Sequence, residues 1–192
     1  IEKIRNLRSV LIAGSVKDLS PLANCKSLKQ LFISMKGAVN TLDFVQGMGL
    51  ESLRLESFTS KSDHLVIPHL PSLQNLEISS VSKMGDLSFL HDFSGLKRIA
   101  LFELNSKKLV DFAKLDQLGE LRLTNMFQLK DLTDLKTITK LNALYIHEFF
   151  INKKIKNELL KIIADLKQID EIILTINGES YRRAELLAEL KK

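Results

Sequence analysis

Residues 96–124 read LKRIALFELNSKKLVDFAKLDQLGELRLT and contain one pattern twice, L-x-x-[LI]-x-L, starting at Leu96 and again at Leu118. Apolar residues at alternate positions of a short segment are typical of a β-strand with one buried face. Parallel neighbouring strands cannot be joined by a tight hairpin, so they need a return segment on one side of the sheet. The pattern therefore predicts a repeating unit of one strand and one return segment.

The pattern extends along almost the whole chain. Its eight copies begin at Leu7, Leu28, Leu50, Leu73, Leu96, Leu118, Leu141 and Ile169. The first seven follow one another at intervals of 21 to 23 residues, and the last interval is 28 residues. Self-similarity at such a period is the signature of a repeat architecture.

The return segments have an apolar pattern of their own. Positions six and three residues before each new copy hold Leu22, Cys25, Phe44, Gly47, Ile67, Leu70, Leu90, Phe93, Phe112, Leu115, Leu135, Ile138, Ile163 and Leu166. Both columns are apolar almost throughout, so we expect these segments to pack inward as short helical or 3-10 turns. Cys25 is then a buried small hydrophobe rather than a reactive thiol.

This repeat resembles that of the leucine-rich repeat family. Units of 22–23 residues with Asp18-Leu19-Ser20-Pro21-Leu22 and Asp86-Leu87-Ser88-Phe89-Leu90 are similar to the bacterial internalin type. The resemblance implies an α/β solenoid, a horseshoe whose concave face is a parallel sheet of about eight strands. It also implies that the concave face binds a partner.

The sequence departs from the internalin pattern at the column that follows each strand. The family places asparagine there, and this chain has Ser15, Lys36, Phe58, Val81, Leu104, Met126 and Phe149. Without the asparagine ladder, we expect the loop amides and carbonyls to be satisfied by other backbone groups or by water.

The repeat defines the domain organisation. Residues 1–176 form the predicted solenoid, whose first repeat is truncated because Ile1 and Ile4 already occupy the two return-segment columns. The long last interval predicts a helix over 153–168. Residues 177–192 then form a capping helix of the same domain, N-capped by Ser180 after a turn at Asn177-Gly178.

The composition excludes several classes of protein. With 45% hydrophobic and 27% charged residues the chain is not disordered. No stretch approaches 18 uncharged apolar residues, so we expect no membrane insertion. A single cysteine excludes internal disulfides and cysteine-rich zinc sites. The compartment stays open between the cytoplasm and an exported fragment of a larger protein.

Catalysis finds little support. The four histidines form no H-x-x-x-H or H-E-x-x-H pair, and there is no P-loop, no G-x-G-x-x-G and no G-x-S-x-G motif. We therefore expect a protein that is not an enzyme and that needs no metal and no cofactor.

The concave face follows from the strand alternation, since the third, fifth and seventh positions of each copy point away from the core. Over eight copies these positions hold three arginines, four glutamates and no lysine. The net charge of +5 therefore lies elsewhere, and nucleic acid, which needs several basic groups along a groove, is an unlikely ligand. Arginine and aromatic residues without lysine are typical of protein interfaces.

We predict that the C-terminal half of this face binds the partner. The residues of this predicted site are Arg98, Phe102, Arg122, Tyr145, His147 and Ile173, with Phe32, Arg54 and Glu77 as secondary candidates. The charged members have an alternative role, because Arg54 beside Glu77 and Arg98 beside Glu120 could simply be cross-strand ion pairs.

Two functions remain compatible with the sequence. The first is a monomeric, non-enzymatic module that recognises a protein through the concave face. The second is the sensor or substrate-recognition arm of a larger bacterial effector, signalling or surface protein whose catalytic or anchoring domain lies outside this chain.

Overall fold

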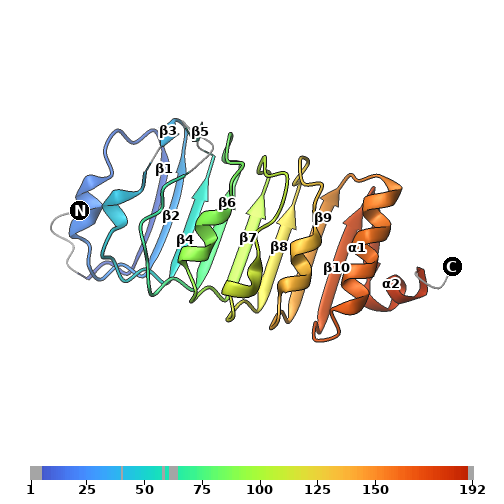
Figure 1. Cartoon of the computed structure of the whole chain (residues 1–192). Coiled ribbons are helices and arrows are strands. Elements are labelled where there is room, and N and C mark those ends of the chain that lie inside the picture. The colour runs from blue at the N-terminus through green and yellow to red at the C-terminus, as the bar shows by residue number, and fades with distance from the viewer. Residues whose placement is uncertain (1–5, 40, 58, 61–64, 190–192) are drawn as a thin grey trace.

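The computed structural model describes residues 6–39, 41–57, 59–60 and 65–189. Its main element is a nine-stranded sheet, along which the chain advances from one end to the other (Figure 1). In spatial order the strands are β1 (Ser9–Gly14), β2 (Gln30–Met35), β4 (Ser52–Glu56), β6 (Asn75–Ser79), β7 (Arg98–Phe102), β8 (Glu120–Thr124), β9 (Ala143–Phe149), β10 (Glu171–Ile176) and β11 (Glu179–Arg182). The first eight pair in parallel, which confirms the predicted sheet of eight parallel strands.

Helical segments cover one face of this sheet (Figure 1). They are the 3-10 helices η1 (Ser20–Asn24), η2 (Asp43–Val45), η3 (Ser88–Asp92), η4 (Phe112–Lys114) and η5 (Thr133–Thr137), and the α-helix α1 (Lys153–Asp165). A separate small sheet pairs β3 (Ala38–Val39) with β5 (Thr59–Ser60). The predicted short turns are therefore confirmed in the return segments that contain η1 to η5, and the longest interval holds the predicted longer helix. The described residues before β6, 65–74, form no helix, although Ile67 and Leu70 are buried as predicted.

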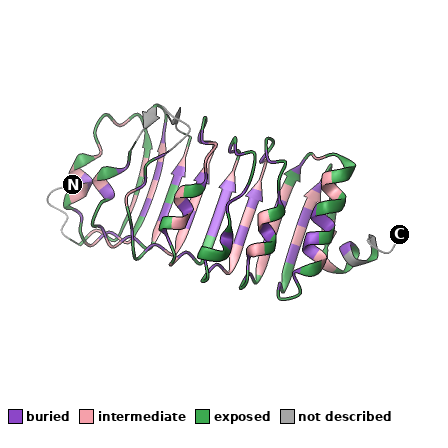
Figure 2. Ribbon diagram, viewed as in Figure 1, coloured by how far each residue is buried: buried purple, intermediate pink, exposed green. Residues whose placement is uncertain are grey.

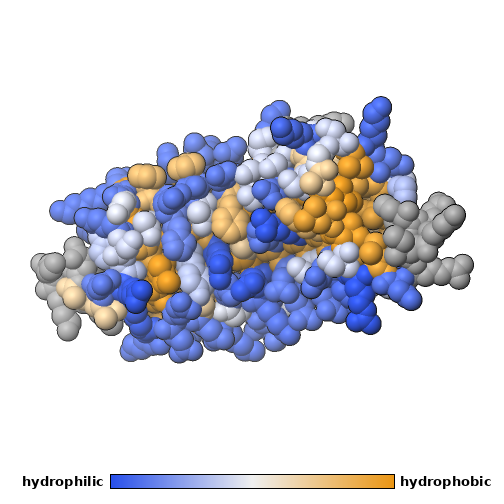
Figure 3. All heavy atoms as spheres, turned by 180° about the vertical axis from the view of Figure 1, so that it is seen from behind, coloured by the Kyte–Doolittle hydropathy of each residue, from blue (hydrophilic) through white to orange (hydrophobic). Residues whose placement is uncertain are grey.

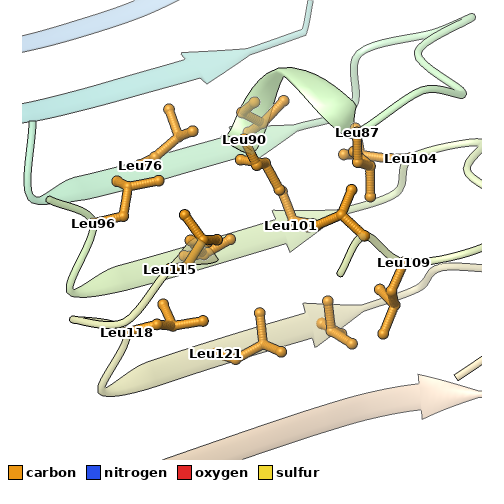
Figure 4. Close-up of a cluster of buried hydrophobic side chains, with 14 of the residues drawn as sticks. Leu76, Leu87, Leu90, Leu96, Leu101, Leu104, Leu109, Leu115, Leu118 and Leu121 are labelled. Carbon is orange, nitrogen blue, oxygen red and sulfur yellow. The ribbon is translucent and has the colours of Figure 1, made fainter. Parts of the chain in front are cut away.

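The core lies between the sheet and these helices. Figure 4 shows Leu76, Leu101 and Leu121 pointing from neighbouring strands toward Leu90 and Leu115 of the return segments. All five side chains are almost completely buried. Along the strands, buried and less buried residues alternate, as the bands in Figure 2 show. Burying one leucine stabilises the fold by about 1.5–3 kcal/mol, so the repeat pattern is also the main source of stability.

The return segment before β4 departs from the predicted register. Phe44 is only partly buried, and Gly47 is exposed with a φ of 71°. The core positions are taken instead by Val45 and Met48, one residue later. The assignment of Phe44 and Gly47 to the core columns was therefore wrong, because the left-handed backbone at Gly47 lies in a turn that directs Val45 and Met48 inward instead.

The column that lacks asparagine is apolar because it is buried. Val81, Leu104, Met126 and Phe149 are almost inaccessible to solvent, whereas Phe58 lies outside the described residues.

The residue before each of these four side chains has a positive φ, and in three repeats it donates its N–H to the next strand. The bonds run from Ser80 to the carbonyl of Phe102 (3.0 Å), from Glu103 to Thr124 (3.0 Å) and from Asn125 to His147 (3.1 Å). Backbone groups thus supply hydrogen bonds at these turns without an asparagine ladder.

The recurrent Asp-Leu-Ser motif shapes the start of each turn. A carboxylate oxygen of Asp18 accepts the backbone N–H of Ser20 at 2.8 Å, and Asp86 accepts that of Ser88 at the same distance. Asp131 and Thr133 repeat the arrangement at 3.0 Å. These bonds satisfy amides that a short 3-10 helix leaves free at its N-terminus.

The C-terminal end differs from the prediction. Residues 177–178 form the expected turn, but Ser180 lies in β11, which pairs antiparallel with β10, and is not the N-cap of a helix. The last helix, α2 (Arg183–Glu189), begins later, and the N–H of Arg182 is accepted by the Glu185 carboxylate at 2.7 Å. Helix α1 ends at Asp165 instead of Gln168.

At the other end, β1 is the first strand of the sheet, and its core-facing Val10 and Ile12 are only partly buried. Ile1 and Ile4 lie outside the described residues.

Candidate functional site

The concave face is built from three columns of side chains held in register by the strand pairing. Ser9, Gln30, Ser52, Asn75, Arg98, Glu120, Ala143 and Glu171 are aligned across the first column. The central column runs from Leu11 through Arg54, Ala100 and Tyr145 to Ile173, as the alternation predicts. The face opposite the helices is therefore an ordered array of side chains on a rigid sheet.

Five of these side chains form a continuous network near the C-terminal end. Arg98 Nη2 lies 2.9 Å from Glu120 Oε2, and Arg122 Nε is paired with the other oxygen of the same carboxylate. The guanidinium of Arg122 lies over the ring of Tyr145, 4.5 Å from its centre. The Tyr145 hydroxyl in turn donates a hydrogen bond to Glu171. The network spans four adjacent strands, β7 to β10.

The network shifts the pKa of two of its members, Glu120 and Tyr145. Partial burial acts to raise the pKa of Glu120, but the hydrogen bonds from Arg98 and Arg122 outweigh it and hold that pKa below its usual value. The hydrogen bond to Glu171 raises the pKa of the Tyr145 phenol. Tyr145 is therefore a neutral donor and Glu120 an anion over the whole neutral range.

His147 adds a second aromatic group to this network. Its ring stacks near that of Tyr145, with 6.4 Å between centres and 14° between planes. Its Nδ1 lies 3.5 Å from the Thr175 hydroxyl. The structure thus brings together Arg98, Arg122, Tyr145 and His147 from three strands, and we refer to these four residues as the C-terminal cluster.

A matching arrangement occurs near the N-terminal end. The guanidinium of Arg54 lies 4.5 Å from the centre of the Phe32 ring, and its Nε lies 3.0 Å from Glu77 Oε1. Its Nη2 lies 3.4 Å from Glu56. The three secondary candidates therefore form one group of an aromatic ring, an arginine and a carboxylate, which mirrors Tyr145, Arg122 and Glu120.

Of the two other predicted residues, Ile173 lies beside the C-terminal cluster, paired in register with Tyr145, and Phe102 lies farther along the face. Phe102 is half-buried and borders a shallow depression of about 340 Å³ together with Arg54, Glu77, Ser79 and Thr124. Ile173 is paired with Arg182 of β11, so the concave face continues for one strand beyond the predicted edge. The predicted site is therefore the C-terminal cluster with Ile173 next to it, and Phe102 is the one member that borders a different part of the face.

The cross-strand ion pairs considered for the charged residues are present. In Arg54–Glu77 and Arg98–Glu120, the arginine side chains remain 46% and 50% exposed. Pairs this exposed contribute about 0–1 kcal/mol each to stability. Their larger effect is to hold each guanidinium in one place at the surface.

Hydrophobic side chains are distributed unevenly over the molecule. Seen from the sheet side, the largest hydrophobic area lies over the N-terminal strands, and smaller patches lie toward the C-terminal end among polar side chains (Figure 3). Leu11 of β1, 66% exposed, belongs to the N-terminal part.

The sequence reasoning missed an aromatic pair outside the sheet. Phe127 and Phe150 follow β8 and β9, are 60% and 66% exposed, and stack with 6.5 Å between ring centres. Each stands one residue after the buried column of Met126 and Phe149. The sequence feature that could have identified this pair is an aromatic residue one position after the buried column in two successive repeats.

The described residues contain no group of three or more His, Cys, Asp or Glu side chains that could hold a metal ion. Within the same ranges, no helix is both long and apolar enough to cross a membrane. The concave face presents arginine, glutamate, tyrosine and histidine side chains in fixed positions.

Eight parallel strands, joined in sequence by return segments on the same face, define a leucine-rich repeat solenoid. Among solved structures, the chain is similar to the crystal structure of an internalin (inlF) from Listeria monocytogenes, with a TM-score of 0.58 and 19% sequence identity. The similarity covers 97% of this chain and 59% of that internalin, and at this identity it shows the fold. No family model and no curated protein matches the chain.

Proposed function

We propose that the chain is a non-enzymatic recognition module that binds a protein partner through the C-terminal half of its concave face. The observation that carries this proposal is the C-terminal cluster itself. Arg122 is held between the Glu120 carboxylate and the Tyr145 ring, so its position is set before a partner arrives. Pre-organised arginine and tyrosine side chains lose little conformational entropy on binding.

The composition of the concave face favours a protein rather than a nucleic acid as the binding partner. Its arginines are paired with glutamates, and the three outward columns contain no lysine that could follow a phosphate backbone. Arginine and aromatic residues are enriched at protein interfaces, and lysine is depleted there.

The alternative function, a recognition arm of a larger protein, uses the same face. The solved internalin is longer than the region aligned with this chain, which spans 59% of its length. The binding chemistry proposed here is the same in both cases, and only the attached activity differs.

The test compares two matched arginines. A partner is first isolated by capture on the wild-type chain, and its affinity is then measured for Arg122→Ala, Tyr145→Ala and Arg54→Ala. Arg122 and Arg54 have similar exposure and each lies over one aromatic ring, so Arg54→Ala controls for the general loss of an arginine. We expect a loss of about tenfold or more for the first two variants, with unchanged thermal stability.

The proposal fails if both C-terminal variants keep full affinity. It also fails if the loss of affinity merely follows a loss of folded protein. An equal or larger loss for Arg54→Ala would move the site to the N-terminal half.

A further inference from the structure

The loops that follow β7, β8 and β9 carry a surface that the concave site does not use. Phe127 and Phe150 stack on one another on two successive loops, with an angle of 21° between the rings. In the packed chain both rings remain more than half exposed, at 60% and 66%. The contact between the two rings leaves most of their area in water, so the fold does not account for their exposure.

The loops that present these rings are held in place by hydrogen bonds. The amide of Asn177 binds the backbone of Ile151 twice, accepting its N–H at 3.0 Å and donating to its carbonyl at 2.9 Å. The N–H of Leu129 is accepted by Met126 at 2.9 Å, and that of Lys130 by Lys107 of the preceding loop at 3.0 Å. Both rings are therefore presented from ordered backbone rather than from loose ends.

Exposed lysines lie close in sequence to this aromatic pair. The segments 104–109, 126–131 and 149–155, the last of which includes the first residues of α1, carry five lysines and one acidic residue, Asp131, whose carboxylate binds Thr133. Two further exposed carboxylates flank these segments, Glu103, which binds Ser80, and Glu148. The lysines are Lys107, Lys108, Lys130, Lys153 and Lys154. All five are exposed, and among the residues that the structure describes none has an ion pair within 4.0 Å, although the charge of Lys108 contributes to lowering the pKa of Asp131.

The loop that precedes these three has a different composition. The equivalent loop after β6, residues 81–86, has one lysine, one aspartate and no aromatic residue. It is also the reverse of the concave face, which has arginine and tyrosine but no lysine. We refer to Phe127, Phe150 and the five lysines as the loop-edge patch.

We propose that the loop-edge patch adsorbs to the surface of an anionic phospholipid bilayer. The exposed lysines complement a negatively charged surface, to which each basic group adds attraction within a Debye length. The two phenylalanines supply the apolar area that enters the interface between headgroups and acyl chains.

A protein partner fits this patch less well than a bilayer. Protein interfaces are depleted in lysine, and their strongest contacts come from tryptophan, tyrosine and arginine. The loop-edge patch has none of these three residues. Adsorption of this kind needs no helix that crosses the bilayer, and it leaves the concave face free for a partner.

The first test uses a property of the sequence, which contains no tryptophan. Phe127→Trp or Phe150→Trp introduces a unique fluorophore into the full chain. On addition of vesicles that contain phosphatidylglycerol, we expect the emission to shift to shorter wavelength and to be quenched by brominated lipid. Leu11→Trp is the matched control, since Leu11 is as exposed as Phe150 but lies on β1. Its emission should not change.

The second test measures the association with sedimented vesicles directly. Wild-type chain should bind vesicles with phosphatidylglycerol, bind less in high salt, and not bind vesicles of phosphatidylcholine alone. Phe127→Ala/Phe150→Ala, and separately Lys107→Glu/Lys130→Glu, should each weaken the association about tenfold or more. Leu11→Ala should leave it unchanged.

Several outcomes would overturn the proposal. They are no association of the wild-type chain with anionic vesicles, association that survives Phe127→Ala/Phe150→Ala, and equal quenching of Leu11→Trp. Binding to poly-L-glutamate without binding to vesicles would assign the patch to an acidic protein instead. Binding of a protein at Tyr145 is a separate measurement, so the two proposals succeed or fail independently.

Discussion

The guanidinium of Arg122 lies 4.5 Å from the centre of the Tyr145 ring on the neighbouring strand, while its Nε is bound to the carboxylate of Glu120 on its own strand. Glu120 also binds Arg98, so one carboxylate positions two cations on the concave face. Removing that carboxylate therefore tests how far the face is pre-organised.

Replacing Glu120 with glutamine should weaken the fold only at neutral pH. The folded-state pKa of Glu120 lies below its reference value of 4.5, so its ionised form contributes stability above that pH. This contribution is lost as the pH falls through the folded-state pKa. Because the side chain is partly exposed, we expect Glu120→Gln to cost no more than about 1 kcal/mol at pH 7. Urea unfolding of both proteins should show this difference shrinking as the pH is lowered below 4.5. A difference that stays constant in acid would show that the carboxylate charge is not its source.

Cys25 should resist thiol reagents in the native protein. Its side chain is 5% exposed and packs in the core behind β2, where a reagent cannot reach the sulfur. Labelling with a chromogenic disulfide should be slow in buffer and rapid in denaturant. Rapid labelling of folded protein would place Cys25 at the surface and would contradict the core assignment of this repeat.

Met48→Ala should destabilise the protein by about 2–5 kcal/mol, because Met48 is 2% exposed and its removal leaves a cavity. Gly47→Ala should act through the backbone instead and cost about 1–2 kcal/mol, since a Cβ at a φ of 71° is strained although no atom lies within 4 Å of it. Chemical unfolding measures both values. The opposite order would favour the register with Gly47 in the core.

Removal of residues 179–192 should lower the melting temperature and promote association. The truncation removes β11, which pairs with β10, and Leu186 of α2, which is 2% exposed and packs in the core. The exposed strand edge and apolar side chains would then be available to a second chain. Size-exclusion chromatography and thermal unfolding test this, with Leu186→Ala as a milder variant that keeps β11. A truncated chain that stays monomeric with unchanged melting would show that the segment is not a cap.

Much of the architecture could be predicted from the repeat. The alternation around Leu96 and Leu118 predicted the strands, their parallel order, the inward columns and the concave side chains, since a strand places successive side chains on opposite faces. A local pattern is sufficient here because each repeat contacts mainly its neighbours. It was not sufficient for the turn before β4, where Val45 and Met48 replace Phe44 and Gly47 in the core. Which side chains of a turn point inward depends on the local backbone and on packing, and the repeat period alone does not specify it.

The C-terminal end shows the same limit. Ser180 has the composition of a helix N-cap, yet it lies in β11, because pairing with the free edge of β10 satisfies more backbone groups than an earlier helix start would. Local capping preference is worth about 1 kcal/mol and is overridden by such pairing.

For the candidate site, the sequence determined which residues share the concave face, because register and period assign each side chain to a side of the sheet. Only the tertiary structure decided which of them touch. It placed Arg122 between Glu120 and Tyr145, and left Phe127 and Phe150 stacked and exposed outside the sheet. The physical reason is that side-chain contacts depend on rotamers and on neighbours from adjacent strands, which are remote in sequence and carry no common period.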